Sequence, residues 1–298
     1  MYKIIKNSNF WFIFSGALSV IAILAIAIYG LRIGIDYKGG TVIEITSNET
    51  NKVASLKEVL DAQGYSEYQI KESSNNTINL RLETLTNEQH IAFQDAAKVK
   101  IADYAESSYD TVGPTIGKDL TKKSIWAVIV ASIGIILYIA FAFRKMPKPL
   151  SSWKFGLSAI IALMHDLLIT TGIVAIMSHF FVWMQVDALF ITAMLTIMGF
   201  SVHDTIVVYD RLRENYIRNP HDNIEITAEK SINQTLARSI NTSMTTIIVL
   251  SCLLVFGSPS IRHFITILII GITLGTYSSI FVASPIVVRW HRKLFRRG

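Results

Sequence analysis

Apolar residues of this chain fall into six long runs that are separated by polar segments. The third run contains the ionisable pair His165 and Asp166, the fourth contains His203 and Asp204, and Arg238 stands at the edge of the fifth. About 20 mostly apolar residues are enough to cross a bilayer as a helix. We therefore predict six transmembrane helices, over residues 10–31, 124–143, 155–177, 188–209, 238–256 and 264–288.

Composition supports the same fold class. The mean hydropathy is +0.42 and only 17% of the residues are charged, which is outside the range of soluble chains and excludes a cytosolic enzyme. The first run follows Lys3 and Lys6, as a signal peptide would, but its 22 uncharged residues exceed the roughly 7 to 15 of a signal peptide core. We predict an uncleaved first span that follows a cytoplasmic N-terminus over residues 1–9.

The segment between the first two spans, residues 37–122, has the pattern of a small folded domain. Alternating and helical periodicities predict strands and helices in the order βαββα, with a further strand near Tyr109. The predicted elements are strands over 41–45, 68–70 and 78–82 and helices over 52–63 and 88–105. The fold class is thus a polytopic α-helical membrane protein with six transmembrane helices and a small α+β extracytoplasmic domain between helices 1 and 2.

Charge distribution predicts the orientation in the membrane. Residues 38–123 hold 10 basic and 13 acidic residues, whereas the rest of the chain holds 18 basic and 9 acidic ones. Sixteen of those 18 lie in the N-terminus, in the loop 144–154, in the cytoplasmic loop 210–237 with the adjoining Arg238, and in the tail 289–298. The positive-inside rule therefore places both termini in the cytoplasm. A basic cluster directly after a span is typical of an orientation signal or an anionic-lipid contact, so we expect membrane lipid and no nucleic acid as its partner.

Ionisable groups inside the spans are the candidate functional residues. A charge at the bilayer centre costs about 2.5 to 3.5 kcal/mol on insertion scales. At a rise of about 1.5 Å per residue, Asp166 lies near mid-membrane and Asp204 in the cytoplasmic third. Both aspartates follow a histidine, but no third residue has metal-ligand spacing, so we expect no metal. The difference in depth also argues against an aspartate pair for intramembrane proteolysis.

A polar stripe runs along the fifth predicted span. Its members recur at offsets of three and four and so share one helical face: Gln234, Arg238, Asn241, Thr242 and Thr245. We expect this face to point inward and to bring Arg238 to Asp204. Two interpretations stay open, a switch in which movement of Arg238 binds or releases a proton, and a static pair that locks two helices together.

Two glycine patterns have structural explanations. Gly271 and Gly275 form a G-x-x-x-G pattern in the last span, which predicts close helix packing. Gly39 and Gly40, which follow Asp36 just outside the membrane, predict a tight turn between the first span and the sheet, with a hinge as the alternative.

Several separated motifs resemble the SecD/SecF family of bacterial protein-export membrane proteins, and among them the SecF members. The match extends over nearly the whole chain. It rests on residues 34–41 (Gly-Ile-Asp-Tyr-Lys-Gly-Gly-Thr), 112–114 (Val-Gly-Pro), 165–166 (His-Asp), 199–205 (Gly-Phe-Ser-Val-His-Asp-Thr), 210–214 (Asp-Arg-Leu-Arg-Glu) and Arg238 followed by 242–246 (Thr-Ser-Met-Thr-Thr). His203 departs from the family, which commonly has Asn there.

The resemblance implies a six-span half of the resistance-nodulation-division superfamily that pairs with a SecD half in the bacterial cytoplasmic (inner) membrane. It implies an accessory subunit that uses the proton-motive force to promote late steps of preprotein export, with SecYEG, YajC, YidC and unfolded preprotein as further partners. The chain would be no enzyme and have no cofactor, with a proton or sodium as the coupling ion. The family's relay residues fall on Asp204 and Arg238, and a second polar group would comprise His165, Asp166, His203, Asn241, Thr242 and Thr245.

Two alternatives to this function remain at the level of the sequence. One is a proton-driven exporter of lipids or small amphiphiles from the same superfamily. Such exporters usually carry larger outer domains and both six-span halves in one chain, which argues against it. The other is a non-conducting scaffold subunit, in which the proton path belongs to the partner alone.

Overall fold

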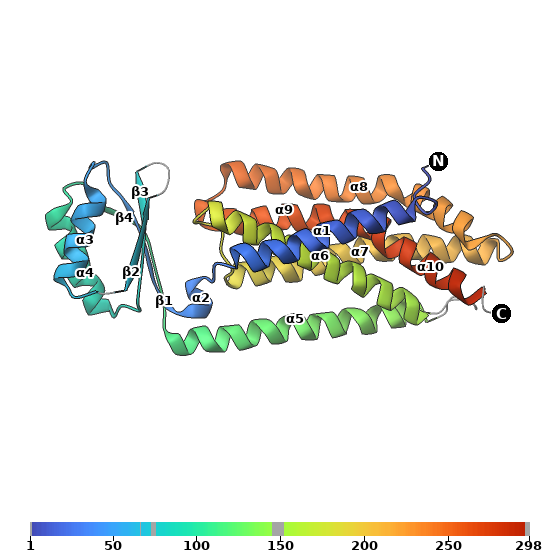
Figure 1. The fold of residues 1–298 in the computed structure, drawn as a ribbon, viewed down its shortest axis with the longest axis horizontal. Coiled ribbons are helices and arrows are strands. Elements are labelled where there is room, and N and C mark those ends of the chain that lie inside the picture. The colour runs from blue at the N-terminus through green and yellow to red at the C-terminus, as the bar shows by residue number, and fades with distance from the viewer. Residues whose placement is uncertain (1, 66, 73–75, 145–151, 296–298) are drawn as a thin grey trace. The chain divides into compact units, whose positions relative to one another are not determined.

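The chain forms two compact units in a computed structural model that describes residues 2–65, 67–72, 76–144 and 152–295 (Figure 1). The bundle unit comprises Met1–Leu31, Trp126–Met184 and Leu189–Gly298. The sheet unit comprises Arg32–Ile125 and Gln185–Ala188. Most of the predicted basic loop 144–154, and residues 296–298 of the predicted tail, lie outside the described residues.

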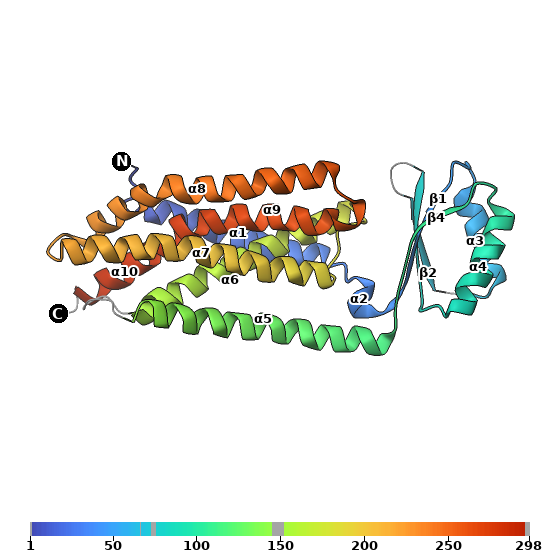
Figure 2. The same cartoon turned by 180° about the vertical axis from the view of Figure 1, so that it is seen from behind.

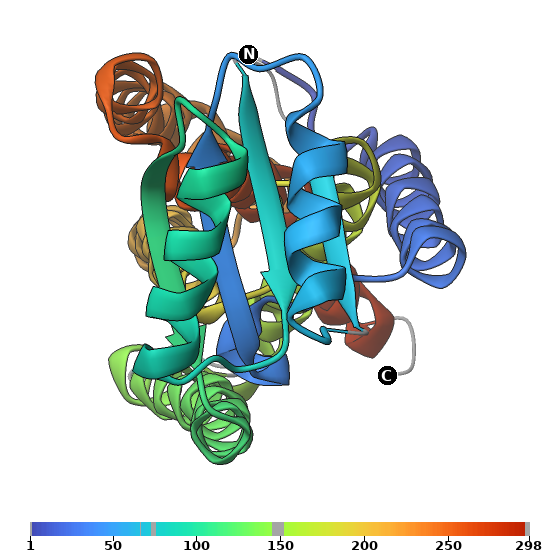
Figure 3. The same cartoon turned by 90° about the vertical axis from the view of Figure 1, so that its left-hand side faces the viewer.

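The sheet unit has the predicted strands and helices. After a short helix α2 (Ile35–Lys38), the elements are β1 (Gly40–Thr46), α3 (Lys52–Ala62), β2 (Tyr68–Glu72), β3 (Thr77–Leu82), α4 (Asn87–Lys100) and β4 (Ala105–Val112). The strands form an antiparallel sheet in the order β2-β3-β1-β4. Figure 3 shows α3 and α4 side by side on one face of this sheet. The expected α+β architecture, including the strand near Tyr109, is therefore confirmed.

Alternation along the strands supplies one layer of the core of this unit. Ile43 and Ile45 of β1 are fully buried, as are Ile78 and Leu80 of β3, because residues two apart share a sheet face. The helices contribute a second layer of buried side chains: Leu56 and Leu60 from α3, and Phe93 and Ala97 from α4.

The face that α4 presents to this core does not carry all of its apolar residues. Ile91 and Val99 are 57% and 85% exposed. Phe93, Ala97 and Ile101 are buried instead, at a spacing of four. The helix also ends at Lys100 rather than at residue 105, because Ala105 begins β4.

Truncation of Phe93 is expected to destabilise the sheet unit. Truncation of a fully buried phenylalanine to alanine lowers the free energy of unfolding by about 3 to 5 kcal/mol, because apolar burial is lost and a cavity remains. Phe93→Ala in the full-length chain should therefore raise hydrogen exchange of the β1 and β3 amides by two orders of magnitude or more. Val99→Ala on the same helix is the matched control and should leave exchange near wild type. Equal exchange in the two variants would contradict the burial pattern.

The bundle unit contains the six long apolar helices that the hydropathy predicts (Figure 2). They are α1 (Ser8–Tyr29), α5 (Pro114–Ala142), α6 (Ser152–Phe180), α7 (Ala188–Arg218), α8 (Ile224–Phe256) and the continuous segment of α9 (Arg262–Ser278), η2 (Ser279–Ala283) and α10 (Ser284–Phe295), with a short turn η1 (Pro259–Ile261) before α9. The first residues of α5 belong to the sheet unit. The segment η2 is a π-helix, which holds one more residue per turn than its neighbours.

Several helices extend beyond the predicted spans. The predicted cytoplasmic loop 210–237 is mostly helical, because α7 continues to Arg218 and α8 begins at Ile224. Asn223 caps the start of α8 by accepting a hydrogen bond from the amide of Glu225. Hydropathy detects the apolar part of a helix and misses polar turns that continue it, so the helices are longer than the spans, and the membrane boundaries of the spans stay a prediction.

The packing of α1 on α6 depends on small residues. A Cβ atom at Gly172 of α6 would lie 2.5 Å from both the Cα and the Cβ of Ala22 of α1. Ala22 and Ala25 are the buried apolar residues of α1, whereas most of its larger side chains are exposed. The two helix backbones therefore approach closely at Gly172, as small residues permit in membrane helices.

An aromatic cluster holds the end of α5 to the bundle. The ring of Phe143 lies 5.6 Å from that of Phe155 on α6 and 5.9 Å from that of Tyr209 on α7. The Tyr209 hydroxyl is 2.6 Å from the Ser158 hydroxyl. Upstream of this cluster α5 is largely exposed.

The segment before α1 is attached to α8. The backbone amides of Ile4, Ile5 and Lys6 all donate to the carboxylate of Glu229. Residues 4–6 of the N-terminus that we predicted over residues 1–9 are thus held against α8, and its last two residues belong to α1.

Candidate buried carboxylate site

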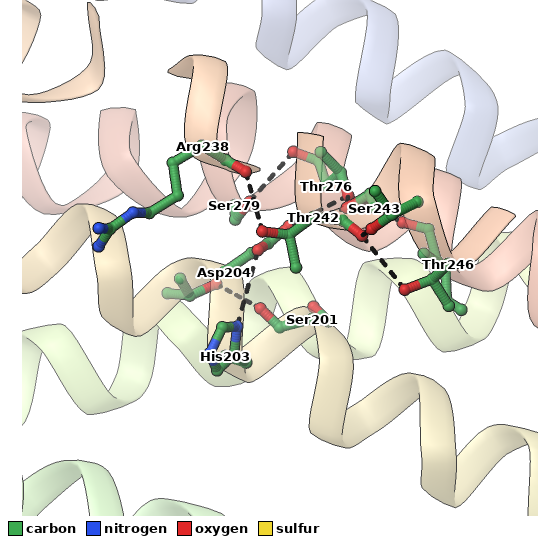
Figure 4. Close-up of polar contacts among 12 residues, drawn as sticks. Ser201, His203, Asp204, Arg238, Thr242, Ser243, Thr246, Thr276 and Ser279 are labelled. Atoms are coloured by element: carbon green, nitrogen blue, oxygen red, sulfur yellow. Dashed lines mark hydrogen bonds and ion pairs between the residues drawn. The ribbon is translucent and has the colours of Figure 1, made fainter. Parts of the chain in front are cut away.

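Asp204 lies on α7 with its carboxylate turned towards α8 and α9 (Figure 4). The residue is 5% exposed. Its Oδ2 accepts hydrogen bonds from Thr276 Oγ1 on α9 at 3.1 Å and from Ser243 Oγ on α8 at 3.4 Å. The Ser243 and Thr276 hydroxyls also hydrogen-bond each other, and His203 Nδ1 is 3.9 Å from Asp204 Oδ1. Neutral hydroxyls from two helices therefore surround this carboxylate.

Close approach of α7 and α9 makes this arrangement possible. A Cβ atom at Gly275 would lie 3.1 Å from the Cα of Ser201, and one at Gly271 would overlap the side chain of Ile197. The G-x-x-x-G pattern is thus a packing surface, as the sequence predicts. It brings Thr276, the residue after Gly275, within hydrogen-bonding distance of Asp204.

Arg238 is on the neighbouring helix α8, but its guanidinium points away from the Asp204 carboxylate (Figure 4). Among the described residues no ion pair joins the two side chains. Arg238 instead lines a groove with residues of α7 and α8 and with the end of α5, among them Phe143, Asp210, Glu214 and Thr235. The expected pairing of Arg238 with Asp204 is absent from this arrangement and stays a prediction about another state.

The polar stripe of α8 is exposed in this chain. Its exposed members are Gln234, Arg238, Asn241 and Thr245, which we call the α8 polar stripe. Gln234, at its start, still accepts hydrogen bonds from Arg211 and Asn215 of α7. Thr242 is half-buried and donates to the carbonyl of Arg238. The expectation of an inward stripe was therefore wrong for this chain. The buried face of α8 carries smaller hydroxyl side chains at a spacing of four: Ser231, Thr235, Ser239 and Ser243. Small side chains allow close packing, and the larger polar ones remain outside.

The residues expected to form a second polar group do not come together as one site. Asp166 is fully buried on α6, where it accepts hydrogen bonds from Ser201 and Ser278 and lies beside the buried His165. The other expected members are elsewhere: the His203 side chain is 65% exposed, and Asn241 and Thr245 belong to the α8 polar stripe. Within the described ranges, no three His, Cys, Asp or Glu side chains could hold a metal ion together.

Asp36 has a role in the sheet unit that the sequence did not reveal. Its Oδ2 accepts a hydrogen bond of 2.9 Å from the amide of Ala188, the first residue of α7. A parallel bridge between Ile33 and Val186 flanks this contact. A carboxylate beside the first amide of a helix satisfies an unpaired donor and favours the helix dipole. Asp36 therefore caps α7, 152 residues along the chain, and sequence spacing carries no signal for such a contact.

Gly39 and Gly40 form the turn that leads into β1. Their φ angles are +77° and +121°, which side chains rarely adopt. A Cβ atom at Gly40 would also lie 2.9 Å from the carbonyl oxygen of Leu82. The geometry explains both glycines as turn residues, without need of a hinge.

Comparison with known proteins agrees with this architecture. The family model for the C-terminal part of the protein export membrane proteins SecD/SecF matches residues 92–293. The protein translocase subunit SecF of Thermobaculum terrenum is 38% identical over 100% of this chain and 96% of its own length. The SecF subunit of Anaerolinea thermophila is 36% identical over 100% of this chain and 98% of its own length. The chain belongs to the SecF family of protein translocase subunits.

A solved structure gives the same result for the fold of this SecF-family chain. SecDF from Thermus thermophilus, described as a translocon-associated membrane protein, superposes with a TM-score of 0.84 at 30% identity. The match covers 98% of this chain but 39% of that SecDF chain. The resemblance found in the sequence motifs and the six-helix fold class are thus confirmed, and family membership gives the chain an accessory role in Sec protein translocation.

Proposed function

We propose that this SecF-family chain works with a SecD partner to couple the proton-motive force to late steps of preprotein export, and that Asp204 takes up and releases the proton. The observation that carries the proposal is a buried carboxylate, on a helix predicted to cross the membrane, that is held by the Ser243 and Thr276 hydroxyls and faces no lysine or arginine among the described residues. An intramembrane carboxylate without a cationic partner is costly when ionised, which favours a role in proton exchange.

Protonation of Asp204 would change the contacts between three helices. The ionised carboxylate accepts hydrogen bonds from α8 and α9, whereas a neutral carboxyl group is a weaker acceptor and has one proton of its own to donate. One charge that crosses a potential of 100 mV supplies about 2.3 kcal/mol, which is comparable to the free-energy difference between two packed states. Proton entry can therefore shift α7 relative to α8 and α9.

Arg238, on the exposed side of α8, would move when the protonation state of Asp204 changes. In the present arrangement it lines the groove with Asp210 and Glu214 and leaves Asp204 without a cation. We propose that loss of the proton from Asp204 draws Arg238 towards the carboxylate, and that proton uptake releases it. The separation of the two side chains here supports a switch over a static ion pair.

The start of α7 offers a route from this site to the segment that precedes the sheet. The amide of Ala188 donates to Asp36, and the amide of Gly34 donates to the carbonyl of Val186 at 2.8 Å. A shift along α7 would therefore pull on the segment 32–38. We propose that this segment moves the sheet unit against an emerging unfolded preprotein.

Orientation and partners follow from the charge distribution and from the family. We propose that both termini are cytoplasmic and the sheet unit extracytoplasmic, because the basic residues outside 38–123 lie almost entirely on one side of the predicted spans. The α8 polar stripe is the surface that we assign to the SecD half. SecYEG, YajC, YidC and membrane lipid remain the further partners that we predict, and the proton is preferred over sodium because the ligands of Asp204 are few.

Export in cells whose only copy of this chain is Asp204→Asn tests the proposal. We expect the signal-peptide-cleaved fraction of a secreted precursor to fall to the level that wild-type cells show with an uncoupler, at equal membrane amounts of the two proteins. Asp222→Asn, which neutralises an exposed carboxylate between α7 and α8, should export normally. Normal export that still responds to the uncoupler in Asp204→Asn cells would assign the chain a scaffold role instead.

A further inference from the structure

Asp166 is the most deeply buried carboxylate of the bundle unit, and the function proposed above does not use it. It is 0% exposed on α6. Its Oδ2 accepts hydrogen bonds from Ser201 Oγ on α7 at 2.7 Å and from Ser278 Oγ on α9 at 2.6 Å. Within the described part of the chain, its one ion-pair neighbour is His165, whose Nδ1 is 3.0 Å from Asp166 Oδ1.

We propose that His165 and Asp166 form a second proton-holding site, which is linked to Asp204 through hydroxyl side chains of α7 and α9. The inference rests on the proposed function of Asp204. A carboxylate removed from water without a compensating charge is strongly unfavourable. An ionised Asp166 beside a neutral His165 carries one negative charge. One additional proton makes the pair electrically neutral, and this is the proton that the site would carry.

His165 offers an entry point for that proton. Its side chain is 8% exposed, and its Nε2 is buried with no hydrogen-bond partner among the described residues. When Nδ1 donates to Asp166, Nε2 is an unsatisfied acceptor. A proton that binds Nε2 allows Nδ1 to give its own proton to Asp166 Oδ1, which leaves a neutral imidazole protonated at Nε2 and a neutral carboxyl group. One proton enters and one is held, so the step is balanced.

The two carboxylates are connected through α7 and α9, because α9 donates a hydroxyl to each and α7 carries both Asp204 and a donor to Asp166. Ser201 and Asp204 are three residues apart on α7, which places them on one helical face. Thr276 and Ser278, which bind Asp204 and Asp166, are two residues apart on α9. A shift of α9 against α7 therefore changes the hydrogen bonds of both acids.

The end of α9 has two features that allow its hydrogen bonds to Asp166 to change. Ser278 Oγ is also 3.2 Å from the carbonyl oxygen of Gly275, so its hydroxyl can turn away from a neutral Asp166. The π-helix η2 begins at the next residue. π-helical turns are weaker points in a helix and occur frequently at functional sites. Among the described residues, Tyr277 on α9 is a further titratable group beside the cluster, with its ring centre 6.3 Å from that of His165.

Infrared difference spectroscopy of the purified full-length chain in lipid vesicles tests the inference without an export assay. Spectra are taken between two pH values that both lie above the range in which exposed carboxylates titrate, in H₂O and in D₂O, to isolate the C=O band of buried protonated carboxyl groups. We expect Asp166→Asn and Asp204→Asn each to remove part of the band and the double variant to remove both parts. Asp222→Asn should leave the band unchanged. Asparagine keeps the size and an acceptor oxygen, so the packing around residue 166 should survive.

The outcomes separate the two proposals. A wild-type band in a folded Asp166→Asn protein would show that Asp166 is a static hydrogen-bond acceptor and overturn the inference. If Asp204→Asn removes part of the C=O band and Asp166→Asn removes none, the proposed function of Asp204 stands and the inference about Asp166 fails. If Asp166→Asn does not fold, Ser201→Ala keeps the carboxyl group and removes its donor on α7. A shift of the band frequency in Ser201→Ala supports proton binding at Asp166, and an unshifted band contradicts it.

Discussion

Gly172→Leu is expected to separate α1 from α6 and to prevent the bundle unit from reaching its packed state. A Cβ atom at this position would lie 2.5 Å from the Cα and Cβ of Ala22 and 3.1 Å from its carbonyl oxygen. These are mostly backbone atoms, so no side-chain rotation can relieve the overlap. Extra methylenes in a packed core typically cost about 1 to 3 kcal/mol, and displacement of a whole helix adds to that.

The measurement is the fraction of the protein that elutes as a monodisperse species after extraction in mild detergent. We expect Gly172→Leu to lose most of this fraction. Gly134→Leu on α5 is the matched control, because no atom lies within 4 Å of its added Cβ position. Ala22→Gly in the Gly172→Leu background should restore part of the fraction, since it removes one of the overlapping atoms. Equal behaviour of Gly172→Leu and Gly134→Leu would contradict the close packing of α1 on α6.

Gly40→Val is expected to destabilise β1 and with it the centre of the sheet. The φ angle of +121° is one that only glycine adopts readily, and such strain costs about 1 to 3 kcal/mol. The added Cβ would also meet the carbonyl oxygen of Leu82 at 2.9 Å, in the strand to which β1 pairs. The two effects should raise hydrogen exchange along β1 and β3 in the full-length chain.

A comparison with Gly64→Ala separates the two causes. Gly64 has a φ angle of +80° but no atom within 4 Å of its Cβ position, so its substitution introduces backbone strain alone. We expect Gly64→Ala to raise exchange locally and Gly40→Val to raise it across the sheet. If the two substitutions had the same local effect, the close approach of β3 to Gly40 would be wrong.

Local periodicity was sufficient to predict the elements of this chain. Alternation in residues 41–45 and 78–82 marks strands that bury one face, and runs of about 20 apolar residues mark the six long helices. The sequence pattern was insufficient where one helix carries apolar residues on two faces, because the pattern does not determine which face is buried. In α4 the apolar residues Ile91 and Val99 are exposed, whereas Phe93 is buried. Periodicity indicates that a helix has an apolar face, but it does not indicate which neighbouring element packs on that face.

The site was predictable only in part, for a related reason. Asp204 and Asp166 are conspicuous because charges are rare in apolar runs. Their hydroxyl partners Ser201, Thr276 and Ser278 are common residues in membrane helices and give no signal until the helices are placed. The α8 polar stripe was expected to face Asp204, because an inward direction is the usual solution for a single bundle.

The outward direction of the α8 polar stripe has a consequence for how cells make this protein. A copy synthesised without its partner would present Arg238, Asn241 and Thr245 to hydrocarbon, where such groups are poorly tolerated. Surplus copies should therefore be short-lived targets of membrane quality control, and expression of the two subunits should be balanced. The stripe thus ties the abundance of one subunit to the synthesis of the other.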